Sequence, residues 1–160
     1  MKRVEKILSH PGFRDSIEKL EQLEADREYC KHDLAHFLDV CRLASLKNRK
    51  ENRNISEDLI YAAGLLHDLG RVLQYKEGLD HNIGSARLAK EILPECGFDS
   101  EEICQIEEAI LGHRQTQKET SNVLADLLYY GDKESRMCGF CKSQETCYWP
   151  EEKKYRPFVG

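Results

Sequence analysis

Apolar residues recur three and four positions apart along most of this chain, with charged residues between them. This spacing is typical of amphipathic α-helices that bury one face. It predicts main helices over about 15–28, 29–47, 56–69, 80–93, 100–112 and 120–132, with shorter helical segments near 1–9 and 71–77. No stretch shows the alternation of a β-strand, and no segment repeats. We therefore expect an all-α fold, a single compact bundle of about six helices.

Turn and cap residues support several of these boundaries. Gly70 suits the left-handed position that ends many helices, and Pro94 should end the helix before it. Asp99 and Glu102 have the spacing of a capping box, which predicts a helix from about residue 100. The small residues at 84–86 should let their helix approach a neighbour closely.

Composition limits the class of protein. The chain has 160 residues, enough for one domain with a core that needs no disulfides. Hydrophobic residues make up 40%, charged residues 33%, and no long apolar run occurs, which favours a soluble globular protein without membrane contact. The net charge of -5 argues against general binding to nucleic-acid backbones. We expect packing helices at 1–28, a helical domain at 29–136, and a cysteine-rich segment with a charged tail, packed on the same domain, at 137–160.

The seven cysteines do not suggest a disulfide framework, because their number is odd and no secretion signal is recognisable. We therefore expect a cytoplasmic protein. Four cysteines are scattered and are interpreted as small buried residues or free thiols. These are Cys30, Cys41, Cys96 and Cys104.

The adjacent pair His67 and Asp68 lies at the end of the most apolar predicted helix, which begins after the N-cap residue Ser56. Burying both side chains without partners would cost several kcal/mol. A divalent cation would compensate both, because imidazole nitrogen and carboxylate oxygen are favoured metal ligands. The alternative is a simple hydrogen bond to each other or to a backbone carbonyl, and the pair His32 and Asp33 shows that one such dipeptide is a weak signal.

Other residues of the same chemistry lie at helix ends or on apolar helix faces. His36, for example, precedes Val40 and Leu43 at helical spacing. The full set comes from five separate segments and consists of His36, His67, Asp68, His81, His113 and Asp132. We hypothesise that these side chains converge on one metal centre.

The order of these residues carries a family resemblance. His36 is followed by the apolar positions 40, 43 and 44, then by the segment 65–71 around His67 and Asp68, and later by Asp132. This ordered set, within residues 30–136, resembles the HD superfamily of metal-dependent phosphohydrolases. The resemblance implies that His36, His67, Asp68 and Asp132 are metal ligands, and that His67 and Asp68 are the catalytic pair.

Two further segments narrow the resemblance. The segment 81–86 resembles the place where dinuclear HD enzymes carry another metal histidine, although Ser85 stands where a glycine is usual. The segment 109–114 resembles the following one, whose histidine is also a ligand. His81 and His113 would thus complete a site similar to the dinuclear branch, which includes bacterial diadenosine-polyphosphate hydrolases and, more distantly, cyclic-dinucleotide phosphodiesterases.

The implied ligand set contains imidazoles and carboxylates but no thiolate. It suits one or two divalent ions, with iron or manganese favoured and zinc, nickel or magnesium as alternatives. Asp68 would bridge two ions, because a carboxylate has two oxygens to share. Basic residues beside the ligands are candidates for binding substrate phosphate, or alternatively surface charges at helix C-termini. The candidates are Arg71, Arg114 and Lys133, and His32 is a further candidate contact.

Three more cysteines form a separate motif near the C-terminus. Cys138 and Cys141 are separated by two residues, and Cys147 follows five residues later. Such a pair is the usual half of a zinc or iron–sulfur site, but one ligand is missing, for which Cys104 or a carboxylate is a candidate. The alternative, which the incomplete set favours, is a loop whose thiols and aromatic residues pack against the helices.

The sequence thus predicts a metal-dependent phosphohydrolase that acts on a small phosphorylated molecule, with a nucleotide or dinucleotide favoured. The competing hypothesis is a non-catalytic regulatory or scaffold module that senses metal or redox state through its C-terminal cysteines. The enzyme is favoured because every expected ligand type is present. Whether the chain forms a homodimer is left open.

Overall fold

The computed structural model describes residues 1–114 and 121–157, and the regular elements within them are all helical. The α-helices are α1 (Lys2–Ser9), α2 (Pro11–Leu23), α3 (Leu34–Lys50), α4 (Glu57–Leu66), α5 (Arg71–Glu77), α6 (His81–Cys96), α7 (Ser100–Gly112) and α8 (Val123–Glu134). Two short 3-10 turns follow, η1 (Cys138–Phe140) and η2 (Glu151–Lys153). The prediction of an all-α fold is confirmed, and the two helices beyond the main six are the short α1 and α5. No described helix combines the length and apolar character that crossing a bilayer requires.

Helix α4 lies at the centre of the bundle and contacts α1, α3, α6, α7 and α8. Its residues from Leu59 to Leu66 are buried except Tyr61, which explains why it lacks the polar face of a surface helix. Helix α3 packs on α4 and α8, and α6 packs between α5 and α7. The core therefore surrounds α4, and the C-terminal end of this helix is buried in the interior of the molecule.

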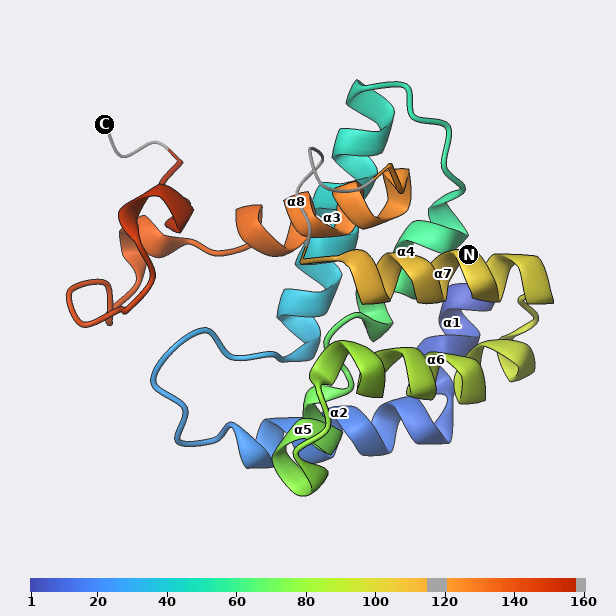
Figure 1. Cartoon of the computed structure of the whole chain (residues 1–160), viewed down its shortest axis with the longest axis horizontal. Coiled ribbons are helices and arrows are strands. Elements are labelled where there is room, and N and C mark those ends of the chain that lie inside the picture. The colour runs from blue at the N-terminus through green and yellow to red at the C-terminus, as the bar shows by residue number, and fades with distance from the viewer. Residues whose placement is uncertain (115–120, 158–160) are drawn as a thin grey trace.

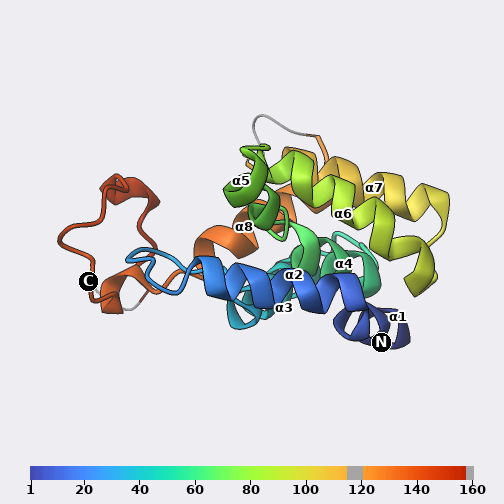
Figure 2. The same ribbon diagram turned by 90° about the horizontal axis from the view of Figure 1, so that it is seen from below.

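The C-terminal segment lies apart from this helical core. In both views it projects from the end of α8 and lies beside the loop that joins α2 to α3 (Figures 1 and 2). Each of its described residues, 137–157, is half-buried or exposed as a whole. Its contacts with the rest of the protein are therefore surface contacts.

Several helix boundaries differ from those expected. Helix α2 begins earlier, at Pro11, because the His10 ring accepts a hydrogen bond from the backbone N–H of Gly12. Helix α3 begins only at Leu34, because the Asp33 side chain caps it by accepting from the N–H of His36. His32 therefore precedes this helix, so the prediction of a helix from residue 29, which would place His32 on one face with His36, is wrong.

Two boundaries in the second half of the chain also required correction. Helix α6 continues through Pro94 to Cys96 and ends where Gly97 adopts a left-handed conformation, with φ of 89°. Helix α8 begins at Val123, and Asn122 caps it by accepting from the N–H of Ala125. The predicted start near residue 120 lies outside the described residues. The predicted capping box of Asp99 and Glu102 is confirmed.

Gly70 has a different role from the one expected. Its φ of -66° is that of an ordinary right-handed residue, and it lies just before α5 rather than in a left-handed cap. A Cβ atom at this position would lie 2.1 Å from the backbone nitrogen of Ser85 and 2.3 Å from the carbonyl oxygen of His81. Glycine is therefore required by close backbone packing on α6, as the small residues at 84–86 predicted for that helix.

Candidate metal centre

His67 and Asp68 directly follow the apolar helix α4 and lie in the interior. The helix ends at Leu66, and the chain then turns as far as Gly70. Both polar side chains lie in this buried turn. His67 is 0% exposed and Asp68 is 2% exposed. Two such groups are stable in the interior only if other groups neutralise or hydrogen-bond them.

One set of partners comes from α3 and α8. His36, in the first turn of α3, and Asp132, near the end of α8, join His67 and Asp68. A donor atom from each of the four lies within 4.8 Å of the other three. Nε2 of His36 is 3.5 Å from Oδ1 of Asp132. Four donors this close have the arrangement that a single divalent cation needs.

A second set of partners comes from α6 and α7. His81 is the first residue of α6 and His113 directly follows α7. Their Nε2 atoms lie 3.2 Å and 3.8 Å from Oδ1 of Asp68, and the three residues form another group within 4.8 Å. Asp68 is therefore shared by both groups, as a bridging carboxylate between two ions would be.

Backbone carbonyls orient two of the imidazoles. Nδ1–H of His67 donates to the carbonyl oxygen of Gly64 at 2.8 Å, and Nδ1–H of His113 donates to the carbonyl oxygen of Ile110. A carbonyl can only accept, so Nδ1 carries the proton in both rings. The Nε2 atoms, which lie 3.7 Å and 3.8 Å from Asp68 oxygens, are therefore the nitrogens left to face a metal.

Two buried atoms of the centre lack a hydrogen-bond partner. They are Nε2 of His67 and Oδ1 of Asp68. Leaving such atoms unsatisfied in the interior costs about 1–3 kcal/mol each. A divalent cation between them would satisfy both, so the residues present fit a bound metal.

The pKa values keep the ligands in their metal-binding forms. Burial, together with nearby arginines, lowers the pKa of His36 to about 2 and that of His81 to about 4. Burial also lowers the pKa of His113. Burial alone would raise the pKa of Asp68, but the surrounding imidazoles and Arg71 outweigh it and hold that pKa well below its ordinary range. At neutral pH these three imidazoles are neutral and the carboxylate is ionised, as metal binding requires.

Comparison with known proteins identifies the family. Residues 33–137 match the profile of the HD domain. The chain belongs to the HD domain family. It is 42% identical over 154 residues to an uncharacterized protein of Clostridium beijerinckii, a match that covers 96% of each chain. The fold is shared with the crystal structure of a predicted HD superfamily hydrolase from an uncultured Thermotogales bacterium, with 24% identity, a TM-score of 0.63, and coverage of 90% of this chain and 82% of that chain.

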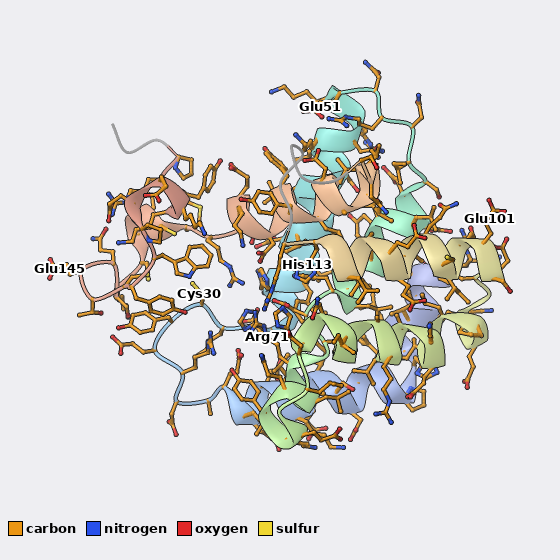
Figure 3. All side chains as sticks on the ribbon, viewed as in Figure 1. Cys30, Glu51, Arg71, Glu101, His113 and Glu145 are labelled. Carbon is orange, nitrogen blue, oxygen red and sulfur yellow. The ribbon has the colours of Figure 1, made fainter. Side chains whose placement is uncertain are left out.

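The candidate metal ligands are called the HD centre from here on. A cavity of about 270 Å³, the HD cavity, lies beside them and is lined by basic side chains. Nε of Arg71 is 3.1 Å from Oδ2 of Asp68, and Nζ of Lys133 is 2.6 Å from Oδ2 of Asp132. Arg114 donates to Nδ1 of His81 at 2.8 Å. All three basic residues singled out from the sequence therefore line the HD cavity, and Figure 3 shows Arg71 and His113 close together in the middle of the molecule.

His32 reaches the same cavity from the loop before α3. Its Nε2 atom is 3.4 Å from Oδ2 of Asp68. On the other side of the ring, Nδ1–H donates to Oε1 of Glu24 at 2.8 Å, and the backbone N–H of His32 donates to Oε2 at 2.7 Å. Glu24 thus fixes the ring with Nε2 facing the HD centre.

The sequence interpretation missed several residues of the HD site. Arg136 donates to Nε2 of His36 at 3.0 Å and lies 3.4 Å from Asp132, and its position four residues after Asp132 on a helical path was a usable signal. Glu24 and the cavity-lining Trp149 had no such signal, because they reach the centre only through folding of the loop after α2 and of the C-terminal segment.

The C-terminal cysteines lie outside the HD centre. Cys138, Cys141 and Cys147 line a separate cavity beside the loop after α2. Cys104, one candidate for the missing ligand, is exposed on α7, and its thiol contacts Glu108. These three thiols are half-buried and lie beside the loop after α2 rather than in the core of the bundle.

Proposed function

We propose that this HD domain is a metal-dependent phosphohydrolase that acts on a small phosphorylated molecule, with a nucleotide or dinucleotide as the favoured substrate. The observation that carries the proposal is the pair of ligand groups that share Asp68 beside a basic cavity. Positive charge around a buried ligand cluster is suited to holding phosphate oxygens while a phosphorus–oxygen bond is hydrolysed.

The residues divide between two ions. His36, His67, Asp68 and Asp132 would hold one, and Asp68, His81 and His113 the other. Nitrogen and oxygen ligands without thiolate favour iron or manganese over softer metals. When bound, such ions lower the pKa of a water molecule and neutralise charge on the phosphoryl group.

The phosphate would be held by the protein's cations. Arg71, Arg114, Lys133 and Arg136 line the HD cavity, and each pairs with one of the ligand side chains. These pairs fix the cations in place, so that binding a phosphate requires little further ordering. Arginine side chains can bind phosphate through two parallel hydrogen bonds.

A nucleotide is favoured because aromatic side chains border the same cavity. Tyr148 and Trp149 both line it, and Nζ of Lys133 lies 5.0 Å from the Trp149 ring. Aromatic rings offer stacking surfaces that accept any nucleobase, worth about 1–3 kcal/mol per base. A phosphate beside Lys133 would therefore have a stacking surface within reach for its base.

His32 is suited to moving a proton. Glu24 accepts the proton at Nδ1, so Nε2 is free to take up or deliver a proton in the cavity. Burial lowers the pKa of His32, although Glu24 acts in the opposite direction. The neutral ring can accept a proton from the attacking water and return it to the leaving group.

The test is hydrolysis of a substrate panel by protein loaded with manganese or with ferrous iron. The panel contains nucleotides, dinucleoside polyphosphates and simple phosphodiesters. We expect turnover of at least one nucleotide, loss of at least a hundredfold in kcat for Asp68→Asn, and no loss for Asp39→Asn, an exposed position on α3. Metal-loaded protein that hydrolyses no member of the panel would overturn the proposal in favour of a non-catalytic scaffold.

A further inference from the structure

A second cavity, of about 320 Å³, is lined by four cysteines. Cys138 is the first residue of the turn η1, Cys141 directly follows this turn, and Cys147 follows in the same C-terminal segment. The fourth is Cys30, from the loop after α2, which the sequence interpretation treated as an isolated thiol. More than a hundred residues separate Cys30 from the others, so only the tertiary structure reveals the set. Figure 3 shows Cys30 on the side of the molecule that faces the C-terminal segment.

The thiols are close enough to influence one another. Burial raises the pKa of Cys30, and negative charge on Cys138, Cys147 and Cys141 raises it further, while Arg136 opposes this effect. All four are free thiols. The four thiols line one cavity, although one of them comes from a loop more than a hundred residues away from the other three.

The segment that carries three of these cysteines has no core of its own. None of residues 137–157 is buried, yet the segment follows a defined path against the loop after α2. The Tyr29 hydroxyl donates to the carbonyl oxygen of Thr146, and the rings of Tyr29 and Tyr148 lie 5.5 Å apart, edge to face. A stretch this short without buried apolar surface normally needs a disulfide or a metal to order it.

The backbone at Cys30 is strained. Its φ of 36° lies in the left-handed region, which is unfavourable for a side chain other than glycine, asparagine or aspartate. Such strain persists where the surrounding structure requires it, most often at functional sites. Here the strained backbone belongs to a cysteine that lines the same cavity as the other three.

We propose that Cys30, Cys138, Cys141 and Cys147 ligate an iron–sulfur cluster of the four-iron type. Four cysteine thiolates are the standard ligand set for such a cluster. A single zinc ion would hold its sulfurs about 3.8 Å apart, given zinc–sulfur bonds of about 2.3 Å. Among the described residues, the groups of three or more donors within 4.8 Å of one another lie in the HD centre and include none of these cysteines. A cluster is larger than one ion, so its thiolates lie farther apart around a larger space.

The cluster would hold a wall of the HD cavity in place. Cys30 lines both cavities, and Tyr148 and Trp149 directly follow Cys147 in the wall of the HD cavity. Joining Cys30 to the C-terminal segment would fix the loop that carries His32 and the turn that carries Trp149. The proposal concerns this second site and does not depend on the reaction at the HD centre.

The first experiment measures iron and acid-labile sulfide in the full-length protein after anaerobic purification and reconstitution with equal parts of ferrous and ferric iron and with sulfide. We expect about four sulfides per chain and a visible absorption band that bleaches on reduction. Sulfide, rather than iron, is the deciding quantity, because iron bound by the HD residues carries none. One zinc per chain without sulfide, or no metal beyond that of the HD centre, would overturn the cluster.

The second experiment compares Cys30→Ala with Cys104→Ala, which removes an exposed thiol on α7. We expect the first variant to lose most of the sulfide and absorption while it keeps its helical circular dichroism, and the second to match the wild type. Full cluster content in Cys30→Ala would show that Cys30 is not a ligand.

A labelling measurement on the wild type covers the case in which Cys30→Ala does not fold. In the reconstituted protein, alkylation followed by mass spectrometry should modify Cys104 and spare the four proposed ligands. After the cluster is removed with a chelator and an oxidant, and the freed cysteines are reduced with dithiothreitol, Cys30, Cys138, Cys141 and Cys147 should become reactive. Equal labelling of these four residues before and after removal would contradict the proposal.

Discussion

At the scale of single residues, the metal centre depends on Asp68. One of its oxygens faces His81 and His113, and the other lies 3.7 Å from His67. A carboxylate shared in this way lets two groups of ligands from different helices use one negative charge. The other ligands each belong to one group only, so single substitutions should separate the two ions.

We expect His81→Gln to lose one ion and keep the other, because the group with His36 and Asp132 does not contain His81. Asp68→Asn should lose both. Metal content of protein purified without a chelator or a nickel column, measured by mass spectrometry, checks this. Complete metal loss in His81→Gln would show that the two positions are not independent.

Glu24 provides a prediction about pH. Burial would raise its pKa, but hydrogen bonds from His32 and Tyr75 lower the pKa from 4.5 to about 2. As the pH falls, the unfolded chain therefore takes up the proton first. The stabilisation is complete above about pH 4.5 and is lost toward pH 2, at about 1.4 kcal/mol per pH unit.

Glu24→Gln should accordingly be less stable than the wild type at pH 6, and the difference in unfolding free energy should shrink as the pH falls below 4.5. Urea unfolding of the metal-free proteins at several pH values measures it. Glu18→Gln, an exposed position on α2, serves as the control and should show little difference. A difference that stays constant with pH would contradict the assigned role of the ionised carboxylate.

At the scale of elements, the second ligand group depends on how closely α5 and α6 approach. The contact passes through Gly70, whose backbone N–H donates to the Ser85 hydroxyl at 2.8 Å. His81 begins α6 on this same contact, so its position relative to Asp68 follows from the packing of the two helices. The family resemblance places a glycine where this chain has Ser85, and here the serine side chain joins the helices by a hydrogen bond.

Gly70→Ala should push the helices apart, because the new Cβ would lie 2.1 Å from the Ser85 nitrogen. We expect a loss of about 3 kcal/mol in unfolding free energy and loss of the ion held by His81. Gly78→Ala is the matched control. No atom lies within 4 Å of its Cβ position, and its φ of 70° should cost only about 1 kcal/mol without metal loss. Equal metal content in both variants would show that this contact does not position His81 for metal binding.

At the scale of the whole molecule, the centre links distant parts of the chain. The proposed ligands come from α3, the turn after α4, α6, the end of α7 and α8. A metal that binds only when these elements are packed stabilises all of them together, because the unfolded chain offers no assembled site.

Manganese at a hundredfold excess over its Kd should therefore stabilise the fold by about 2.7 kcal/mol. For a chain of this size we expect Tm to rise by roughly 5–10 °C. Differential scanning calorimetry with and without the ion measures the shift, and Asp68→Asn provides the control because it should show none. A wild-type Tm that does not respond to the metal would mean that the centre does not join these helices.

The sequence by itself determined the all-α class, the approximate helices and the types of ligand, because helical periodicity and side-chain chemistry are local properties. It also pointed to His36, His67, Asp68 and Asp132 through their order along the chain. Only the tertiary structure decided that Asp68 is shared by two groups, that Glu24 and Arg136 surround them, and that Cys30 joins the C-terminal cysteines. These relations are distances between residues far apart in the chain, and such distances depend on how helices pack and where loops lead, which local spacing does not encode.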